Sequence, residues 1–97
     1  MYALFKFTTQ FNFCYVINVK NHQIIKAFGQ RLREVRISQS ISQEQLANDA
    51  DIPISQVGRI ERGEVNTTIS TIFALATALE VNVEELLNLS INKIGKK

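Results

Sequence analysis

The side chains best suited to chemistry in this sequence lie on one face of a helix expected at residues 54–62. That outward face carries Ile54, Ser55, Gly58, Arg59 and Arg62. A guanidinium group such as that of Arg59 can donate two hydrogen bonds to O6 and N7 of guanine, which discriminates between bases by about 1–3 kcal/mol. The alternative is an ordinary solvated arginine on an exposed helix. The face therefore indicates either nucleic-acid recognition or plain solvent contact.

Side chains typical of enzymes and metal sites are scarce. The chain of 97 residues contains one histidine, His22, and one cysteine, Cys14. These numbers exclude an intramolecular disulfide, a cysteine metal cluster and a multi-histidine metal site. The carboxylates are scattered, and the sequence contains no nucleophile–base set or phosphate-binding loop. We therefore expect neither an enzyme nor a bound metal or other cofactor.

The composition is that of a small globular domain. Hydrophobic residues make up 45% of the chain and charged residues 21%, close to the average for globular proteins. The formal net charge of +2 permits nucleic-acid binding without indicating it. No apolar run approaches the roughly 20 residues that a membrane helix needs, and the N-terminus lacks the features of a signal peptide. We expect a cytoplasmic protein without a membrane segment.

From residue 22 onward, apolar residues recur at helical spacing. Ile25, Phe28, Leu32 and Val35 repeat every three or four positions, which is typical of one buried helix face. Similar patterns predict five helices, at about residues 23–38, 43–50, 54–62, 69–80 and 83–89. Because these helices are short and joined by short links, the sequence predicts an all-α bundle.

Residues that begin and end helices support these boundaries. Ser42 followed by Gln45, and Asn82 followed by Glu85, match the capping box, in which each side chain bonds to the other residue's backbone. Gly63 is expected to end the helix 54–62 in the left-handed conformation. The capping pattern therefore places helix starts after residues 42 and 82.

Residues 1–21 form a separate aromatic arm. Its apolar residues, among them Phe11, Phe13 and Tyr15, fall on odd positions and its polar residues mostly on even ones. This period of two is typical of a strand, and a single strand needs a partner. The arm is expected to pair with a second subunit, to pack on its own domain, to bind another protein, or to be a poorly ordered tail. The domain boundaries expected are 1–21 for the arm, 22–89 for the helical domain and 90–97 for a basic tail.

The segment from residue 42 to 63 has the spacing of a helix-turn-helix. Two helices of about eight residues are separated by about three residues. The apolar residues Leu46, Ala47, Ile52, Val57 and Ile60 are spaced to bury the facing sides of both helices. The spacing alone therefore predicts that the outward face of the second helix is available to a ligand.

Residues 28–89 resemble the Cro/repressor-type helix-turn-helix domain of the xenobiotic-response-element family of bacterial and phage regulators. The resemblance rests on the blocks FGQRLREVR, ISQEQLA, VGRIERG and IFALATALEVNVEELL, in order and at the expected spacing. It implies a five-helix, lambda-repressor-like fold whose third helix enters the major groove of double-stranded DNA. It also implies a homodimer, most often a repressor, on a palindromic operator whose half-sites lie about 34 Å apart.

The resemblance assigns roles to individual positions. Base contacts are expected from Ile54, Ser55, Gly58 and Arg59, and phosphate contacts from Gln43, Gln56, Arg62 and Asn66. Arg36 and Glu61 are expected to form a partly buried ion pair that connects the first helix to the end of the third. The dimer interface is expected at Phe73, Leu87 and Leu89, for which the alternative is the core.

Three positions depart from the family's pattern. Ile54 is apolar where the family usually has a polar residue, Gly58 offers no side chain, and Pro53 replaces a capping serine. The operator sequence therefore does not follow by analogy. Two other functions stay open: an antitoxin-like or partner-binding module that uses the arm, and a restriction–modification controller. The acidic fourth and fifth helices are expected to face away from DNA.

Overall fold

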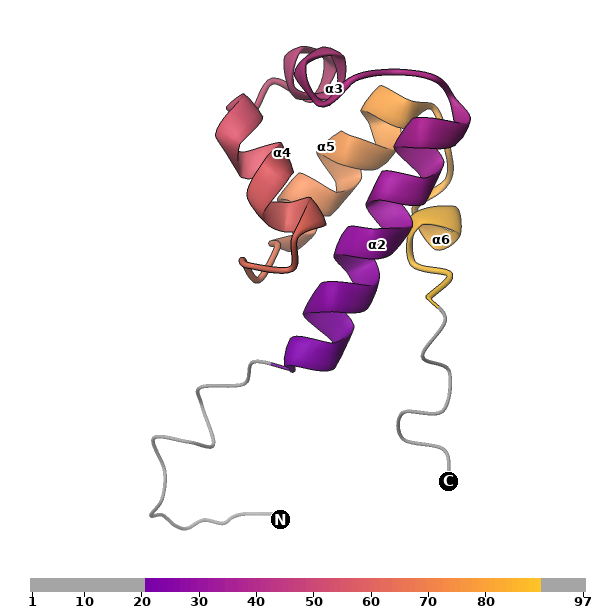
Figure 1. Cartoon of the computed structure of the whole chain (residues 1–97). Helices are drawn as coiled ribbons and strands as arrows, with labels where there is room; N and C mark the ends of the chain where they lie inside the picture. Colours follow the sequence, from indigo (N-terminus) through magenta and orange to yellow (C-terminus); the bar gives the residue numbers. More distant parts are fainter. Residues whose placement is uncertain (1–20, 90–97) are drawn as a thin grey trace, which may run out of the picture.

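The computed structural model describes residues 21–89, and this part of the chain forms five helices (Figure 1). Their bounds are α2, His22–Ser38; α3, Gln43–Ala50; α4, Ile54–Glu61; α5, Ile69–Leu79; and α6, Val83–Leu86. The expected all-α fold is confirmed. The strand expected in the arm, Cys14 and the lysine-rich tail lie outside the described residues.

The helix starts follow from side-chain caps that accept hydrogen bonds from free backbone N–H groups. Ser42 accepts from the backbone N of Gln45, and Thr68 accepts from that of Thr71. The side chain of Asn21 accepts from Ile24 N, which starts α2 one residue earlier than expected. These caps explain why α2, α3 and α5 begin within a residue of the predicted positions, whereas α4 begins after Pro53 without a side-chain cap.

The two predicted capping boxes are only partly correct. The amide of Gln45 bonds to Asp49 instead of returning to residue 42. Asn82 makes no side-chain cap, because the Glu85 backbone N–H bonds to the Asn82 carbonyl oxygen at 2.9 Å. Helix α6 ends at Leu86 rather than at the predicted residue 89, because the α-helical hydrogen-bond pattern stops there: the N–H of Asn88 bonds to the Glu85 carbonyl, and that of Leu89 to the Leu87 carbonyl.

One core holds all five helices together. Seven large side chains in it are almost fully inaccessible to solvent: Leu32, Leu46, Val57, Ile60, Leu75, Leu79 and Leu86. Two long polar side chains add links across the core's rim. Arg31 Nε donates to the Glu85 carbonyl at 2.9 Å, and Gln39 Nε2 donates to that of Leu79 at 2.7 Å. The first bond joins α2 to α6, and the second joins the residue that follows α2 to the end of α5.

Two glycines permit close approaches around α2. A Cβ atom on Gly29 would collide with the backbone carbonyl of Ile60 and lie 2.8 Å from that of Glu61. Gly29 therefore lets α2 cross the C-terminal end of α4 at backbone distance. Gly63 has φ +74° and packs on Lys26, which confirms the predicted left-handed end of the α4 segment.

Candidate nucleic-acid interface

Helices α3 and α4 form the helix-turn-helix that the spacing predicts (Figure 1). Asp51 ends α3 in the left-handed conformation, with φ 60°. Pro53 then starts α4 with φ −63° and no side-chain cap, as its ring dictates. The inner faces of both helices are buried through Leu46, Ala47 and their partners in the core. The outer face of α4 is thereby held toward solvent.

A buried polar network sets the orientation of α4. Glu61, at the end of α4, is 9% exposed and accepts hydrogen bonds from Arg36 Nε at 2.7 Å and Nη2 at 3.1 Å. Gln43 Nε2 donates to the same carboxylate at 2.9 Å. Arg36 Nη1 also donates to the Ile41 carbonyl at 2.9 Å. The structure thus brings together the expected Arg36–Glu61 pair and adds Gln43, joining α2, α3 and α4.

This network changes the role open to Gln43. The family resemblance predicts that Gln43 contacts phosphate, yet its side-chain amide donates a hydrogen bond to Glu61. Gln43 is the first residue of α3, so a phosphate can still bind at the helix N-terminus, where backbone N–H groups favour an anion. The sequence does not predict the link to Glu61, because a glutamine 18 positions away carries no pairing signal.

Three of the four expected base-contacting residues are exposed on α4. Ile54 is half exposed, and Ser55 and Arg59 are exposed. Of the residues expected to contact phosphate, Gln56 is half-buried, whereas Asn66 is exposed in the loop that follows Gly63. The polar side chains of Ser55 and Arg59, one helical turn apart, therefore share one solvent-facing surface.

Gly58 differs from the other three because Arg62 covers it. A Cβ atom on Gly58 would lie 3.0 Å from Arg62 Nη1 and 3.8 Å from Gln43 Oε1. The Arg62 guanidinium also donates to both carboxylate oxygens of Glu64, at 2.8 and 3.3 Å. These hydrogen bonds lower the pKa of Glu64 and raise that of Arg62. Arg62 is thus bent across the α4 face toward α3, over the space that a side chain at position 58 would take.

Apolar side chains are exposed on the other side of the molecule. Phe73 is 55% exposed and Leu87 is 45% exposed, whereas Leu89 is half-buried. Leu87 and Leu89 line a small apolar cavity of about 90 Å³ together with Ile24 and Phe28. Ile69, which the sequence analysis did not single out, is 73% exposed at the start of α5. Residues 21–89 therefore leave Ile69 and Phe73 of α5, and Leu87 just after α6, uncovered.

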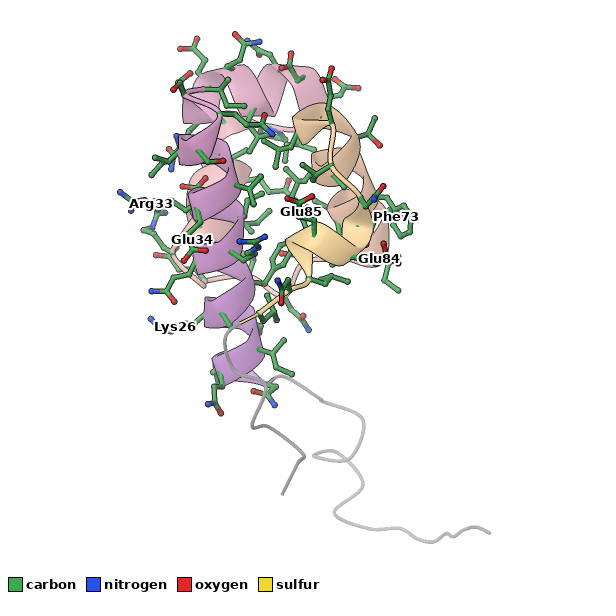
Figure 2. All side chains as sticks on the ribbon, turned by 90° about the vertical axis from the view of Figure 1, so that its right-hand side faces the viewer. Lys26, Arg33, Glu34, Phe73, Glu84 and Glu85 are labelled. Carbon is green, nitrogen blue, oxygen red and sulfur yellow. The ribbon has the colours of Figure 1, made fainter. Side chains whose placement is uncertain are left out.

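The two sides also differ in the charges they carry (Figure 2). Lys26, Arg33 and Glu34 project from α2 on one side, and Phe73 and Glu84 lie on the opposite side. No cluster of residues that could bind a metal ion occurs in the part of the chain that the structure describes. No helix within residues 21–89 is long and apolar enough to span a membrane.

Comparisons with known proteins agree with this geometry. Residues 32–86 match the HTH_3 helix-turn-helix family. The control protein C.BamHI of Bacillus amyloliquefaciens is 39% identical over 62 residues, which cover 63% of this chain and 76% of that protein. The immunity repressor protein of Bacillus phage phi105 is 36% identical over 58 residues, which cover 60% of this chain but 40% of the phage protein.

The fold is also similar to that of a solved structure. The crystal structure of the restriction-modification controller protein C.AhdI from Aeromonas hydrophila aligns with a TM-score of 0.63 and 44% sequence identity. The alignment covers 68% of this chain and 98% of that one. The chain therefore belongs to the HTH_3 family of helix-turn-helix DNA-binding transcriptional regulators, a family of regulators and not of enzymes.

Proposed function

We propose that this protein is a dimeric controller of restriction–modification genes that binds a palindromic DNA operator with α4 in the major groove. The observation that carries the proposal is the exposed face of α4, which the Arg36–Glu61–Gln43 network orients. The similarity of this chain to C.BamHI and C.AhdI favours a controller role. The phage repressor supports repression as a second mode of action, over a smaller share of its own length.

Base recognition is assigned to Ser55 and Arg59. Both side chains are exposed and one turn apart on α4. Arg59 donates to guanine O6 and N7, and Ser55 adds a hydrogen bond of low specificity. Ile54, half exposed at the start of α4, packs against a thymine methyl group. Gly58 makes no direct contact, because Arg62 occupies the space above it.

Phosphate contacts flank that face. We assign them to the N-terminal end of α3 at Gln43, to Gln56, to Arg62 and to Asn66. Arg62 lies near the start of α3, so a phosphate at the helix N-terminus also meets its guanidinium. Such contacts position the protein on the duplex without selecting its sequence.

The exposed apolar surface on α5 and α6 is assigned to dimerisation. Phe73, Ile69 and Leu87 are exposed there, and their burial against a second copy removes apolar area from water. Two copies related by a two-fold axis present two α4 helices to successive major grooves, which matches a palindromic operator.

Selection of bound fragments from a random-sequence DNA pool tests the proposal. The full-length protein is incubated with the pool at physiological salt, and the retained DNA is sequenced. We expect a palindromic consensus with half-sites about one helical turn apart, roughly 10 base pairs. Recovery of DNA without a consensus would contradict sequence-specific binding.

The controller role needs a separate test in cells. The DNA upstream of the protein's own gene is joined to a reporter, and transcription is measured as protein concentration rises. We expect a concentration-dependent change that disappears when the selected consensus is scrambled, and neighbouring genes for an endonuclease or methyltransferase. A neighbouring small toxin-like gene would instead favour the partner-binding function, in which the arm at residues 1–21 binds another protein.

A further inference from the structure

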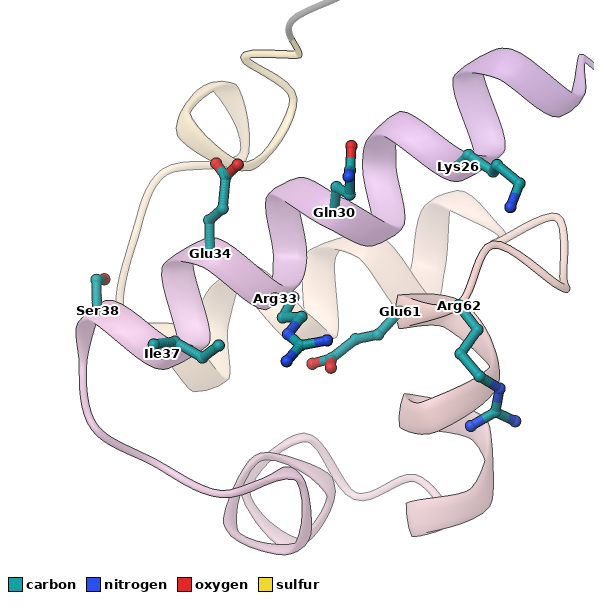
Figure 3. Close-up of a pocket in the computed structure, with 8 residues that line it drawn as sticks. All are labelled: Lys26, Gln30, Arg33, Glu34, Ile37, Ser38, Glu61 and Arg62. Atoms are coloured by element: carbon teal, nitrogen blue, oxygen red, sulfur yellow. The ribbon is translucent and has the colours of Figure 1, made fainter.

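One face of α2 forms a wall of an open groove, and the DNA contacts proposed above do not use this α2 face. The groove has a volume of about 830 Å³. Lys26, Gln30 and Arg33 line it from α2, and Glu61 and Arg62 line it from the end of α4 (Figure 3). The spacing of the α2 residues, four and then three positions, keeps them on one face of the helix.

Two cationic side chains in this groove are available to bind an external anion. Lys26 and Arg33 make no ion pair within residues 21–89. Of the two carboxylates, Glu61 already accepts hydrogen bonds from Arg36 and Gln43. Glu34 is turned away from α4 in Figure 3 and lies 3.4 Å from Arg31. The groove therefore holds two cations without an ion pair in residues 21–89, beside carboxylates whose charge is partly met elsewhere. Lys26 also acts on Glu64 at longer range, since its charge lowers the pKa of that carboxyl group.

The position of the groove connects it to the proposed DNA surface. Arg62 lines the groove and also covers Gly58 on α4, near Gln43 at the start of α3. A phosphate backbone that meets Arg62 is therefore adjacent to the α2 face. Lys26 and Arg33 are separated by about 10 Å along the helix axis, at 1.5 Å per residue. The two side chains are therefore far enough apart to meet different phosphates of the DNA backbone.

We propose that Lys26 and Arg33 of α2 bind the sugar–phosphate backbone of double-stranded DNA beside the half-site, extending the footprint beyond the helix-turn-helix. This inference rests on the proposed function, since it requires that α4 binds DNA. The contact adds affinity that is independent of base sequence and sensitive to salt, because each neutralised phosphate releases condensed counterions.

The double variant Lys26→Ala/Arg33→Ala tests the proposal in the full-length protein. Affinity for the selected operator is measured over a range of salt concentrations, and the DNA-pool selection is repeated. We expect the same consensus, with the slope of log K against log salt reduced by about 1.8 per protomer. Wild-type binding should weaken when the base pairs flanking the half-sites are removed, and binding by the variant should not.

Two single substitutions of equal charge serve as matched controls. Glu34→Gln and Glu84→Gln each remove one negative charge, but only Glu34 lines the groove. We expect tighter binding for Glu34→Gln alone, and an equal gain for both would show only a net-charge effect. A retained consensus with an unchanged salt slope in the double variant would overturn the α2 contact and leave the proposed function standing. A wild-type protein that selects no consensus would remove the basis of both.

Discussion

The α2–α4 side and the α5–α6 side of this small domain carry different kinds of side chains. On the first side, charged groups have defined positions: the Glu61 carboxylate accepts from Arg36 at 2.7 Å and from Gln43 at 2.9 Å. On the second side, α5 and α6 contain no lysine or arginine, and their exposed groups include the apolar Phe73 and the acidic Glu84. The two sides share one apolar core.

This difference indicates that the two sides bind different partners. DNA recognition needs donors held at set positions, because hydrogen bonds to bases are directional. Association with a second copy needs apolar area that water leaves on contact. We therefore infer that the first side faces DNA and that the second faces a protein. The following substitutions test each side separately.

The largest effect is expected from Glu61→Ala. The substitution leaves the Arg36 guanidinium largely buried without its carboxylate, since that side chain is 12% exposed. Removing one partner of a buried pair costs about 3 kcal/mol or more, which lowers the Tm of a domain this size by more than about 10 °C. Calorimetry and DNA titration should show losses in both stability and affinity. An unchanged Tm would contradict the structural role of the network.

Two helical glycines on the first side provide a matched pair with opposite expectations. Gly29→Ala places a methyl group against the carbonyls of Ile60 and Glu61, so we expect a loss of about 2 kcal/mol in the free energy of unfolding. Gly58→Ala displaces only the flexible end of Arg62, and it should gain up to about 1 kcal/mol from helix propensity. Urea denaturation measures both. Equal effects would show that the α2–α4 crossing is not close.

On the second side, Phe73→Glu should separate the subunits. A carboxylate in an apolar interface is desolvated without a partner, so sedimentation should show monomers where the wild type is dimeric. Loss of the second half-site should reduce operator affinity by at least about 100-fold. Asn48→Glu, an exposed position on α3, controls for added charge. A Phe73→Glu variant that stays dimeric would place the interface elsewhere.

The smallest effect is expected from Glu64→Gln, which removes the exposed pair with Arg62. Exposed ion pairs contribute little, so the Tm at neutral pH should not change measurably. Because Arg62 lowers the pKa of folded Glu64, the pair's contribution is present above the unfolded pKa and is lost as pH falls through the lower folded value. Because the pair contributes little, melting curves of wild type and variant taken down to about pH 3 should differ by no more than a small increment, which disappears at the acid end.

Local sequence signals predicted most of the fold. Ser42 and Gly63 marked helix ends through backbone chemistry that depends on few neighbours, and both behave as expected. Asn82 carried a similar signal, but no side-chain cap forms, and α6 closes after four residues. A capping pattern describes what a side chain can do, whereas the packing of the following turn decides what it does.

The candidate site was less predictable than the fold. The spacing placed Ser55 and Arg59 on one exposed face, which the structure shows. It could not show that Arg62 folds back over Gly58, because that depends on the rotamer of a long side chain. Nor could it show that Gly29 marks a helix crossing, since a glycine inside a helix carries no sign of its neighbours across the fold.

The central claim is that the exposed face of α4 selects the DNA sequence. The most direct measurement is the DNA-pool selection carried out in parallel with wild-type protein and Arg59→Ala. We predict that the variant loses its preference at one base pair, symmetrically in both half-sites, with a cost of about 1–3 kcal/mol on the wild-type operator. An identical consensus from both proteins would contradict the claim that Arg59 on α4 contacts a base.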